Sequence, residues 1–195
     1  GDLFSKNKKI VYPTEKELLN FYEESWIDDW YDDAIQKEKY HQNGIKQLKE
    51  YYQKFKGQLR APLFLEKGFT IKIKDYGIRG FLDRVDADKS GWEVIDYKTG
   101  NPKDKLTFDD KKQLLLYQVA VAEVFKQEIK NLTFYYLTNN QPVSFVGTQK
   151  EIDKVKDWAI SIIEQILSHD FTAKPGFACE YCDFKSVCPY AKQVK

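Results

Sequence analysis

The stretch "GFLDRVDADKSGWEVIDYKTG", residues 80–100, carries the most information about the fold. Apolar and polar residues alternate on both sides of Asp88-Lys89-Ser90-Gly91, which predicts two β-strands joined by a tight turn. A two- or four-residue loop at this point sets Asp83 opposite Asp96. Opposed side chains lie about 4.5–5.5 Å apart across a sheet. Two carboxylates so placed repel one another unless a cation lies between them.

A lysine follows the second acid at the spacing of a shared strand face. The register that opposes the two acids also pairs Val85 with Val94. Lys98 comes two residues after Asp96, so strand alternation puts its ammonium on the same face, while Tyr97 points away. Oxygen ligands that leave positions open to water and phosphate suit Mg²⁺ or Mn²⁺ better than Zn²⁺. The pattern therefore predicts metal-assisted phosphodiester hydrolysis.

A second register for the same hairpin carries no chemistry. A three-residue loop with Gly91 as a G1 bulge would set Arg84 against Asp96 as a surface ion pair. The two registers differ in which residue faces Asp96, so a structure distinguishes them.

The rest of the chain predicts an α/β domain with one mixed sheet. Residues 15–30, with a capping box at Thr14, and a stretch from Asp32 or Asp33 to residue 55 indicate helices. Alternating apolar stretches from residue 63 indicate strands. Two further helices, residues 108–127 and 148–167, alternate with the later strands, which implies helices packed around a mixed sheet. We expect a single domain, 1–195, with a helical N-terminal region (1–60), a core (63–170) and a cysteine-rich tail (171–195).

Bulk composition excludes some classes of protein. Lys and Arg total 31 and Asp and Glu total 30 in 195 residues, so any basic site must be local. The sequence has neither a long apolar run nor a signal peptide, and we expect a cytoplasmic protein with no membrane partner. Its three cysteines all lie in the last 17 residues, which suits a metal site or free thiols better than disulfides.

Four stretches in order, "LEKGF", "GFLDRVD", "VIDYKTG" and "QLLLY", together with the tail "CEYCDFKSVCPY", resemble the PD-(D/E)xK nuclease superfamily. The likeness is to its RecB-like branch, found fused to UvrD-like helicases, and covers residues 63–190. It implies a restriction-endonuclease-like core. It also implies that Asp83, Asp96 and the main-chain carbonyl of Tyr97 bind Mg²⁺ or Mn²⁺, and that Lys98 positions the attacking water.

Further positions match elements of the same family. Gln113 and Tyr117 fit its Q-x-x-x-Y element and share one helix face, where they could contact substrate phosphate or the Lys98 region. Packing in the core is the alternative for Tyr117. Glu66 matches an upstream acid of this branch, and a plain surface role is equally compatible with it.

Two features depart from the family pattern. The branch has a histidine ligand on an earlier helix, whereas the context of His41 indicates a solvated or helix-packing residue and His169 a structural one. The resemblance implies a [4Fe–4S] cluster, which uses four thiolates, but the C-x₂-C-x₅-C tail provides three, namely Cys179, Cys182 and Cys188. We expect the chain to belong to a longer protein that supplies the missing ligands. Zinc held by three cysteines and a histidine, or three free thiols, are the alternatives.

The sequence thus predicts a metal-dependent deoxyribonuclease that acts on single-stranded or unwound DNA, and we expect exonuclease action. The resemblance implies a helicase domain in the same or an associated polypeptide and a role in DNA recombination and repair. Two alternatives stay open. One is a catalytically impaired module of the same fold that binds DNA or a partner protein, and the other is a zinc-ribbon interaction domain, which leaves the D-Y-K strand unexplained.

Overall fold

The structure is a computed structural model that describes residues 12–29, 31, 33–58 and 61–191. It divides into two compact units, residues 1–155 and 156–195. Within the described residues of the first unit, strands form a five-stranded sheet in the order β1-β2-β3-β4-β5. These strands are β1 (Phe64–Ile73), β2 (Tyr76–Asp88), β3 (Gly91–Lys98), β4 (Ile129–Tyr136) and β5 (Gln141–Phe145).

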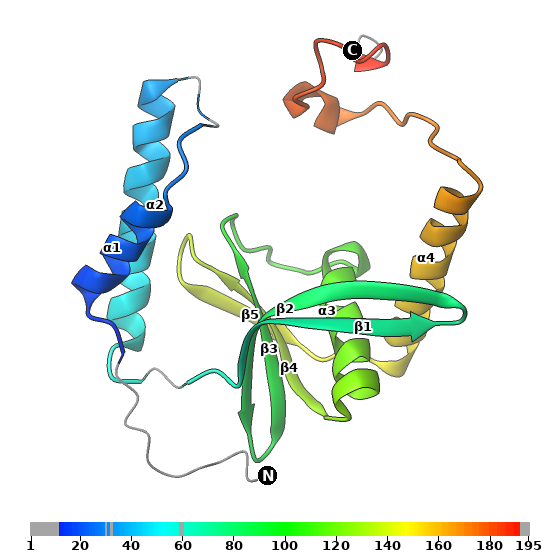
Figure 1. The fold of residues 1–195 in the computed structure, drawn as a ribbon, viewed down its shortest axis with the longest axis horizontal. Helices are drawn as coiled ribbons and strands as arrows, with labels where there is room; N and C mark the ends of the chain where they lie inside the picture. The colour runs from blue at the N-terminus through cyan, green and yellow to red at the C-terminus, as the bar shows by residue number, and fades with distance from the viewer. Residues whose placement is uncertain (1–11, 30, 32, 59–60, 192–195) are drawn as a thin grey trace. The chain divides into compact units, whose positions relative to one another are not determined.

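The sheet is mixed, as the sequence predicts. Neighbouring strands are antiparallel except for β3 and β4, which are parallel. A parallel pair needs a crossover, and helix α3 (Phe108–Ala120) supplies it. Strands β1 and β2 form the long hairpin seen in Figure 1. In this strand order β3 is the middle strand, between β2 and β4.

Helices cover both faces of this sheet. Helix α3 packs on one face through buried leucines and through Tyr117, whose ring meets Phe69 of β1 edge-on at 5.8 Å. Helix α2 (Ala34–Phe55) lies on the other face, where the ring of Tyr51 contacts Tyr97 of β3 and Tyr135 of β4. The core residues between these layers include Val85, Val94, Leu114, Leu115 and Leu132, all with 0% exposure.

Capping side chains fix where the helices begin. Thr14 and Glu17 form the predicted capping box of α1 (Glu15–Ser25), and the Asp33 carboxylate caps α2. Thr148 and Glu151 cap α4 (Gln149–Leu167) in the same way. The prediction that the first helix runs to about residue 30 is wrong, because the backbone turns extended at Trp26.

The predicted helix 108–127 is also regular over a shorter range. After Ala120 the chain widens into a π-helical turn, Val121–Phe125, and it ends at Lys126 in the left-handed conformation. The Lys126 backbone N–H donates to the carbonyl of Val121, which closes the turn before β4. Among the described residues, no helix combines the length and the apolar character needed to cross a bilayer.

Candidate active site

The hairpin of β2 and β3 has the register that favours the acidic pair. Val85 pairs with Val94, as predicted, and Asp88 pairs with Gly91 across a two-residue turn. The Asp88 carboxylate accepts a hydrogen bond from the Ser90 N–H at 2.7 Å and so stabilises this turn. Arg84 therefore pairs with Ile95 and not with Asp96, which excludes the bulged alternative.

The paired ladder ends one position short of the two acids. Beyond Arg84 the strands separate, and the Asp83 carboxylate accepts a hydrogen bond from the backbone N–H of Tyr97 at 3.3 Å. That N–H belongs to the residue directly after Asp96. The two carboxylates are therefore neighbours, and the negative charge of Asp83 is one of the causes that raise the pKa of Asp96.

Asp96 is the most constrained acid of the site. It is 1% exposed, and its Oδ2 atom is buried. The Lys98 ammonium lies 2.6 Å from Oδ2 and forms an ion pair with it. Burial is the largest cause of the raised pKa of Asp96, while Lys98 opposes the shift. A buried carboxylate with incomplete compensation is suited to receive a further cation.

A chain of polar contacts runs from Asp96 to helix α3. The Lys98 ammonium donates to Gln113 Oε1 at 3.0 Å, and Gln113 Nε2 donates to the Tyr117 hydroxyl at 2.8 Å. Lys98 also lies 5.4 Å from the centre of the Phe134 ring, a cation–π contact from the neighbouring parallel strand. These contacts hold the lysine beside the acid while its side chain stays 37% exposed.

The pKa of Tyr117 also depends on the charges of this site. Burial, the largest cause, and then the negative charges of Asp96, Asp83 and Glu66 raise its pKa, while Gln113 has the opposite effect. The phenol is therefore protonated at neutral pH. It contacts both the core, through Phe69, and the polar chain, so its packing in the core is observed and its role in the site stays a prediction.

Glu66 lies on the adjacent strand at a distorted position. Leu65 pairs with Arg84 and Lys67 with Leu82, so this register brings Glu66 to the level of Asp83. Glu66 itself has a φ of 46°, in the left-handed region that a residue with a β-carbon seldom adopts. A local break of this kind re-aims side chains within a strand. Three acids therefore lie at one level of β1, β2 and β3.

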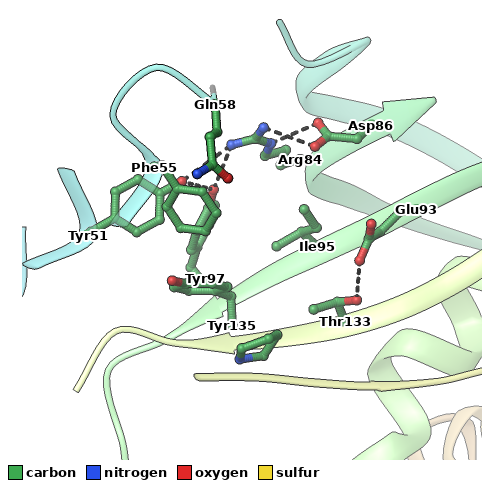
Figure 2. A pocket seen from close by; sticks show the side chains of 11 residues that line it. Tyr51, Phe55, Gln58, Arg84, Asp86, Glu93, Ile95, Tyr97, Thr133 and Tyr135 are labelled. Atoms are coloured by element: carbon green, nitrogen blue, oxygen red, sulfur yellow. Dashed lines mark hydrogen bonds and ion pairs between the residues drawn. The ribbon is translucent and has the colours of Figure 1, made fainter. Parts of the chain in front are cut away.

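The back of the same hairpin contains an arginine cluster that sequence patterns did not reveal (Figure 2). Arg84 donates to both carboxylate oxygens of Asp86, at 2.8 and 2.9 Å, and to the hydroxyls of Tyr51 and Tyr97 at 3.4 and 3.2 Å. Tyr97 points away from the acidic face, as predicted from alternation. The cluster thus connects α2, through Tyr51, to β2 and β3 at Arg84, the last paired residue of β2 before Asp83. A signal was present in the polar residues at alternate positions of "DRVD".

Among the described residues, the three cysteines of the tail do not form a group that could hold a metal ion. Cys179, Cys182 and Cys188 are free, and the first lies in a short 3₁₀ helix, Phe177–Tyr181. Three thiols also fall one short of the four that a [4Fe–4S] cluster uses, so the described tail alone does not fit such a cluster. His41 packs against aromatic rings of α1 and bonds Glu23 at 2.9 Å, which agrees with the predicted helix-packing role.

The acidic face provides some, but not all, of the ligands that a divalent metal needs. Within residues 12–191, gaps aside, no three His, Cys, Asp or Glu side chains are close enough to hold an ion together. Two observations nevertheless fit a hard cation: the buried Asp96 carboxylate, whose charged form burial disfavours, and the second carboxylate beside it. The donor set is all oxygen, which suits Mg²⁺ or Mn²⁺.

The fold and the acidic hairpin together define an α/β protein with a restriction-endonuclease-like core. The sequence model of the PD-(D/E)XK nuclease superfamily matches residues 11–189, and the chain belongs to that superfamily. A solved structure described as "Crystal structure of SSO0001" is 18% identical, with a TM-score of 0.44, and the match covers 91% of this chain and 94% of that one. No curated protein matches.

Proposed function

We propose that this chain hydrolyses phosphodiester bonds in DNA, with Mg²⁺ or Mn²⁺ held by Asp83, Asp96 and the main-chain carbonyl of Tyr97. The observation that carries the proposal is the nearly inaccessible Asp96 carboxylate beside both a second acid and Lys98. Glu66, at the level of Asp83 on β1, would add a further oxygen ligand through water. A bound divalent ion would supply positive charge that polarises a phosphoryl oxygen and acidifies a nearby water.

The protein side chains orient the reaction. An ammonium has three N–H groups. In Lys98 one of them is directed at Asp96 in the ion pair, and a second donates to Gln113. A further N–H is then available to hold water or a phosphate oxygen in line with the scissile bond. Water forms the new bond to phosphorus as the bond to the leaving sugar oxygen breaks. Gln113 and Tyr117 keep the ammonium in position through their hydrogen bonds.

The finer assignments rest on the resemblance to the RecB-like branch. We propose an exonuclease acting on single-stranded or unwound DNA, associated with a helicase in recombination and repair. A [4Fe–4S] cluster would need a fourth ligand from outside this chain, so no step of the reaction is assigned to it.

The alternative is a module of the same fold that binds DNA or a partner without cutting it. One observation favours it: the described residues do not gather three metal-ligating side chains. The two proposals differ in whether end-labelled DNA is degraded.

The test is digestion of labelled single-stranded DNA in Mg²⁺ or Mn²⁺. The wild type should cut, whereas Asp96→Asn and Lys98→Met should not. Asp109→Asn, an exposed acid of α3, and Lys72→Met, an exposed lysine of β1, serve as matched controls that should retain activity. Equal digestion by all five proteins would reject the catalytic assignment.

Substrate topology tests the finer proposals. An exonuclease should leave circular single-stranded DNA intact while degrading the linear form. Blunt duplex DNA should resist the chain until its strands are separated. Rapid cutting of the circle would reject exonuclease action, and rapid cutting of blunt duplex would contradict the need for an unwinding partner.

A further inference from the structure

A cavity of about 750 Å³ lies between the two N-terminal helices and the carboxyl ends of β3 and β4. Aromatic side chains form one wall, and the segment Thr99–Asn101 with Leu137 and Thr138 forms the other. Its size is within the usual range for ligand pockets. It is also at the edge where ligands bind in sheets with parallel strands, outside their carboxyl ends.

The aromatic wall is a row of rings at stacking distance. The centroids of Trp26 and Tyr31 are 5.7 Å apart with planes only 6° from parallel, and Tyr31 and Tyr40 follow at 5.6 Å. Tyr40 is 53% exposed at the end of the row, so its ring is not simply part of the packing between helices. Amide side chains accompany the rings, namely those of Asn43, Gln47 and Asn101.

The opposite wall follows directly from the candidate active site. Thr99 is the residue after Lys98, and consecutive Cα atoms are about 3.8 Å apart. The Thr138 hydroxyl donates to the carbonyls of Thr99 and Gly100, both at 2.8 Å, and the Leu137 N–H donates to the Lys98 carbonyl at 2.8 Å. The cavity therefore begins within two residues of the lysine and is held there by hydrogen bonds.

We propose that this cavity binds unpaired nucleobases of single-stranded DNA, which enter beside the bond to be cut. The inference rests on the proposed function, because it takes DNA as the substrate. Every base presents a π-face that stacks on aromatic rings, and the amides can hydrogen-bond base edges. Paired bases are stacked within a duplex and could not enter, so the cavity selects single strands.

Charge supports stacking over phosphate binding as the source of affinity here. The residues lining the cavity are uncharged, and the nearby corner between the helices carries acids such as Glu23 and Asp28. Asp28 is in an ion pair with Lys37 at 2.7 Å. Loss of a ring should therefore weaken binding without changing its dependence on salt, which reports phosphate contacts.

The experiment measures fluorescence anisotropy of a labelled oligothymidylate and of an abasic strand of the same length. Both are titrated with protein in EDTA, so nuclease activity or its absence does not affect the result. The wild type should bind the base-containing strand at least about fivefold more tightly, as stacking of a single base allows. Tyr40→Ala should lose this preference at an unchanged salt slope.

Three variants complete the design. Tyr40→Phe keeps the ring and should bind as the wild type does, and so should Phe21→Ala, which removes an exposed aromatic of α1 outside the cavity. A β-carbon at Gly100 would meet no atom within 4 Å, so Gly100→Leu should fold, and its side chain would add bulk at the cavity wall beside Lys98 and reduce the preference. This variant decides the matter if circular dichroism shows Tyr40→Ala to be unfolded. Equal affinity of the wild type for both strands, or a preference retained in Tyr40→Ala or Gly100→Leu, would overturn the proposal.

Discussion

Asp96→Asn should make the metal-free protein more stable while removing its activity. The carboxylate is buried, and burial and Asp83 both disfavour its charged form. Asparagine keeps the shape, removes the charge and offers an N–H group toward Asp83. The ion pair with Lys98 is lost, but the Lys98 side chain is 37% exposed and its ammonium keeps Gln113 as an acceptor.

The net gain should be about 1–2 kcal/mol, the order of most single-substitution effects, because the change relieves both the burial of a charge and its repulsion by Asp83. In a chain of this size, each 1 kcal/mol moves Tm by about 2–4 °C, so Tm in EDTA should rise by about 2–8 °C. Mn²⁺ at about 100 times its Kd should stabilise the wild type by about 2.7 kcal/mol, and the variant far less.

Differential scanning fluorimetry in EDTA and across a Mn²⁺ titration measures both effects. Asp109→Asn is the control, because Asp109 is 80% exposed and should change neither value by more than about 1 °C. A Tm for Asp96→Asn that falls in EDTA would refute the reasoning about the buried charge. A Mn²⁺ shift equal to that of the wild type would refute the assignment of Asp96 as a ligand.

Three further substitutions probe the lysine, the hairpin turn and a helix cap. Lys98→Met should lower kcat on single-stranded DNA by about 100-fold or more and keep the Mn²⁺-induced rise in Tm, because the lysine orients water and binds no metal. Gly91→Ala should lower the free energy of unfolding in urea by about 1–3 kcal/mol, since φ is 123° there and a β-carbon would lie 2.9 Å from the carbonyl oxygen of Glu128. Hydrogen bonds from Lys103, the larger cause, and from Thr107 lower the pKa of Asp110 to about 2. The ionised Asp110 carboxylate therefore stabilises the fold above its ordinary pKa, and this stabilisation is lost as the pH falls through about 2. Asp110→Asn should therefore lose less stability than the wild type between pH 4 and pH 2 in urea titrations.

Each of these expectations has a distinct contrary result. A Lys98→Met protein with full kcat would show that another group orients the nucleophile. Unchanged urea stability in Gly91→Ala would show that the turn relaxes without strain. The same acid sensitivity in Asp110→Asn as in the wild type would show that other carboxylates control unfolding at low pH.

Local patterns predicted the fold well where one interaction dominates. The Asp88 to Gly91 turn set the hairpin register, and the pairs of Thr14 with Glu17 and Thr148 with Glu151 marked helix starts, because these are contacts between near neighbours. A third box, Thr107 with Asp110, was missed because the short acid replaces the usual glutamate.

Features that depend on tertiary packing could not be predicted in this way. The ladder stops before Asp83, Glu66 turns left-handed, and Arg84 reaches tyrosines from two elements. None of these follows from the alternation of a strand. The family resemblance predicted that Gln113 could contact the Lys98 region. Local patterns could not predict this contact, because residues 15 positions apart meet only once α3 crosses the sheet.

The outer strands of the sheet bear on how the protein behaves at high concentration. An unpaired strand edge is a template on which further chains can add and aggregate. Pro142 lies in β5 and has no N–H to offer an incoming strand, while β1 carries Lys67 and Lys72, whose charges oppose close approach of another copy. Both edge strands thus disfavour edge-to-edge association with another copy. Pro142→Val is the substitution to avoid when variants are prepared in quantity.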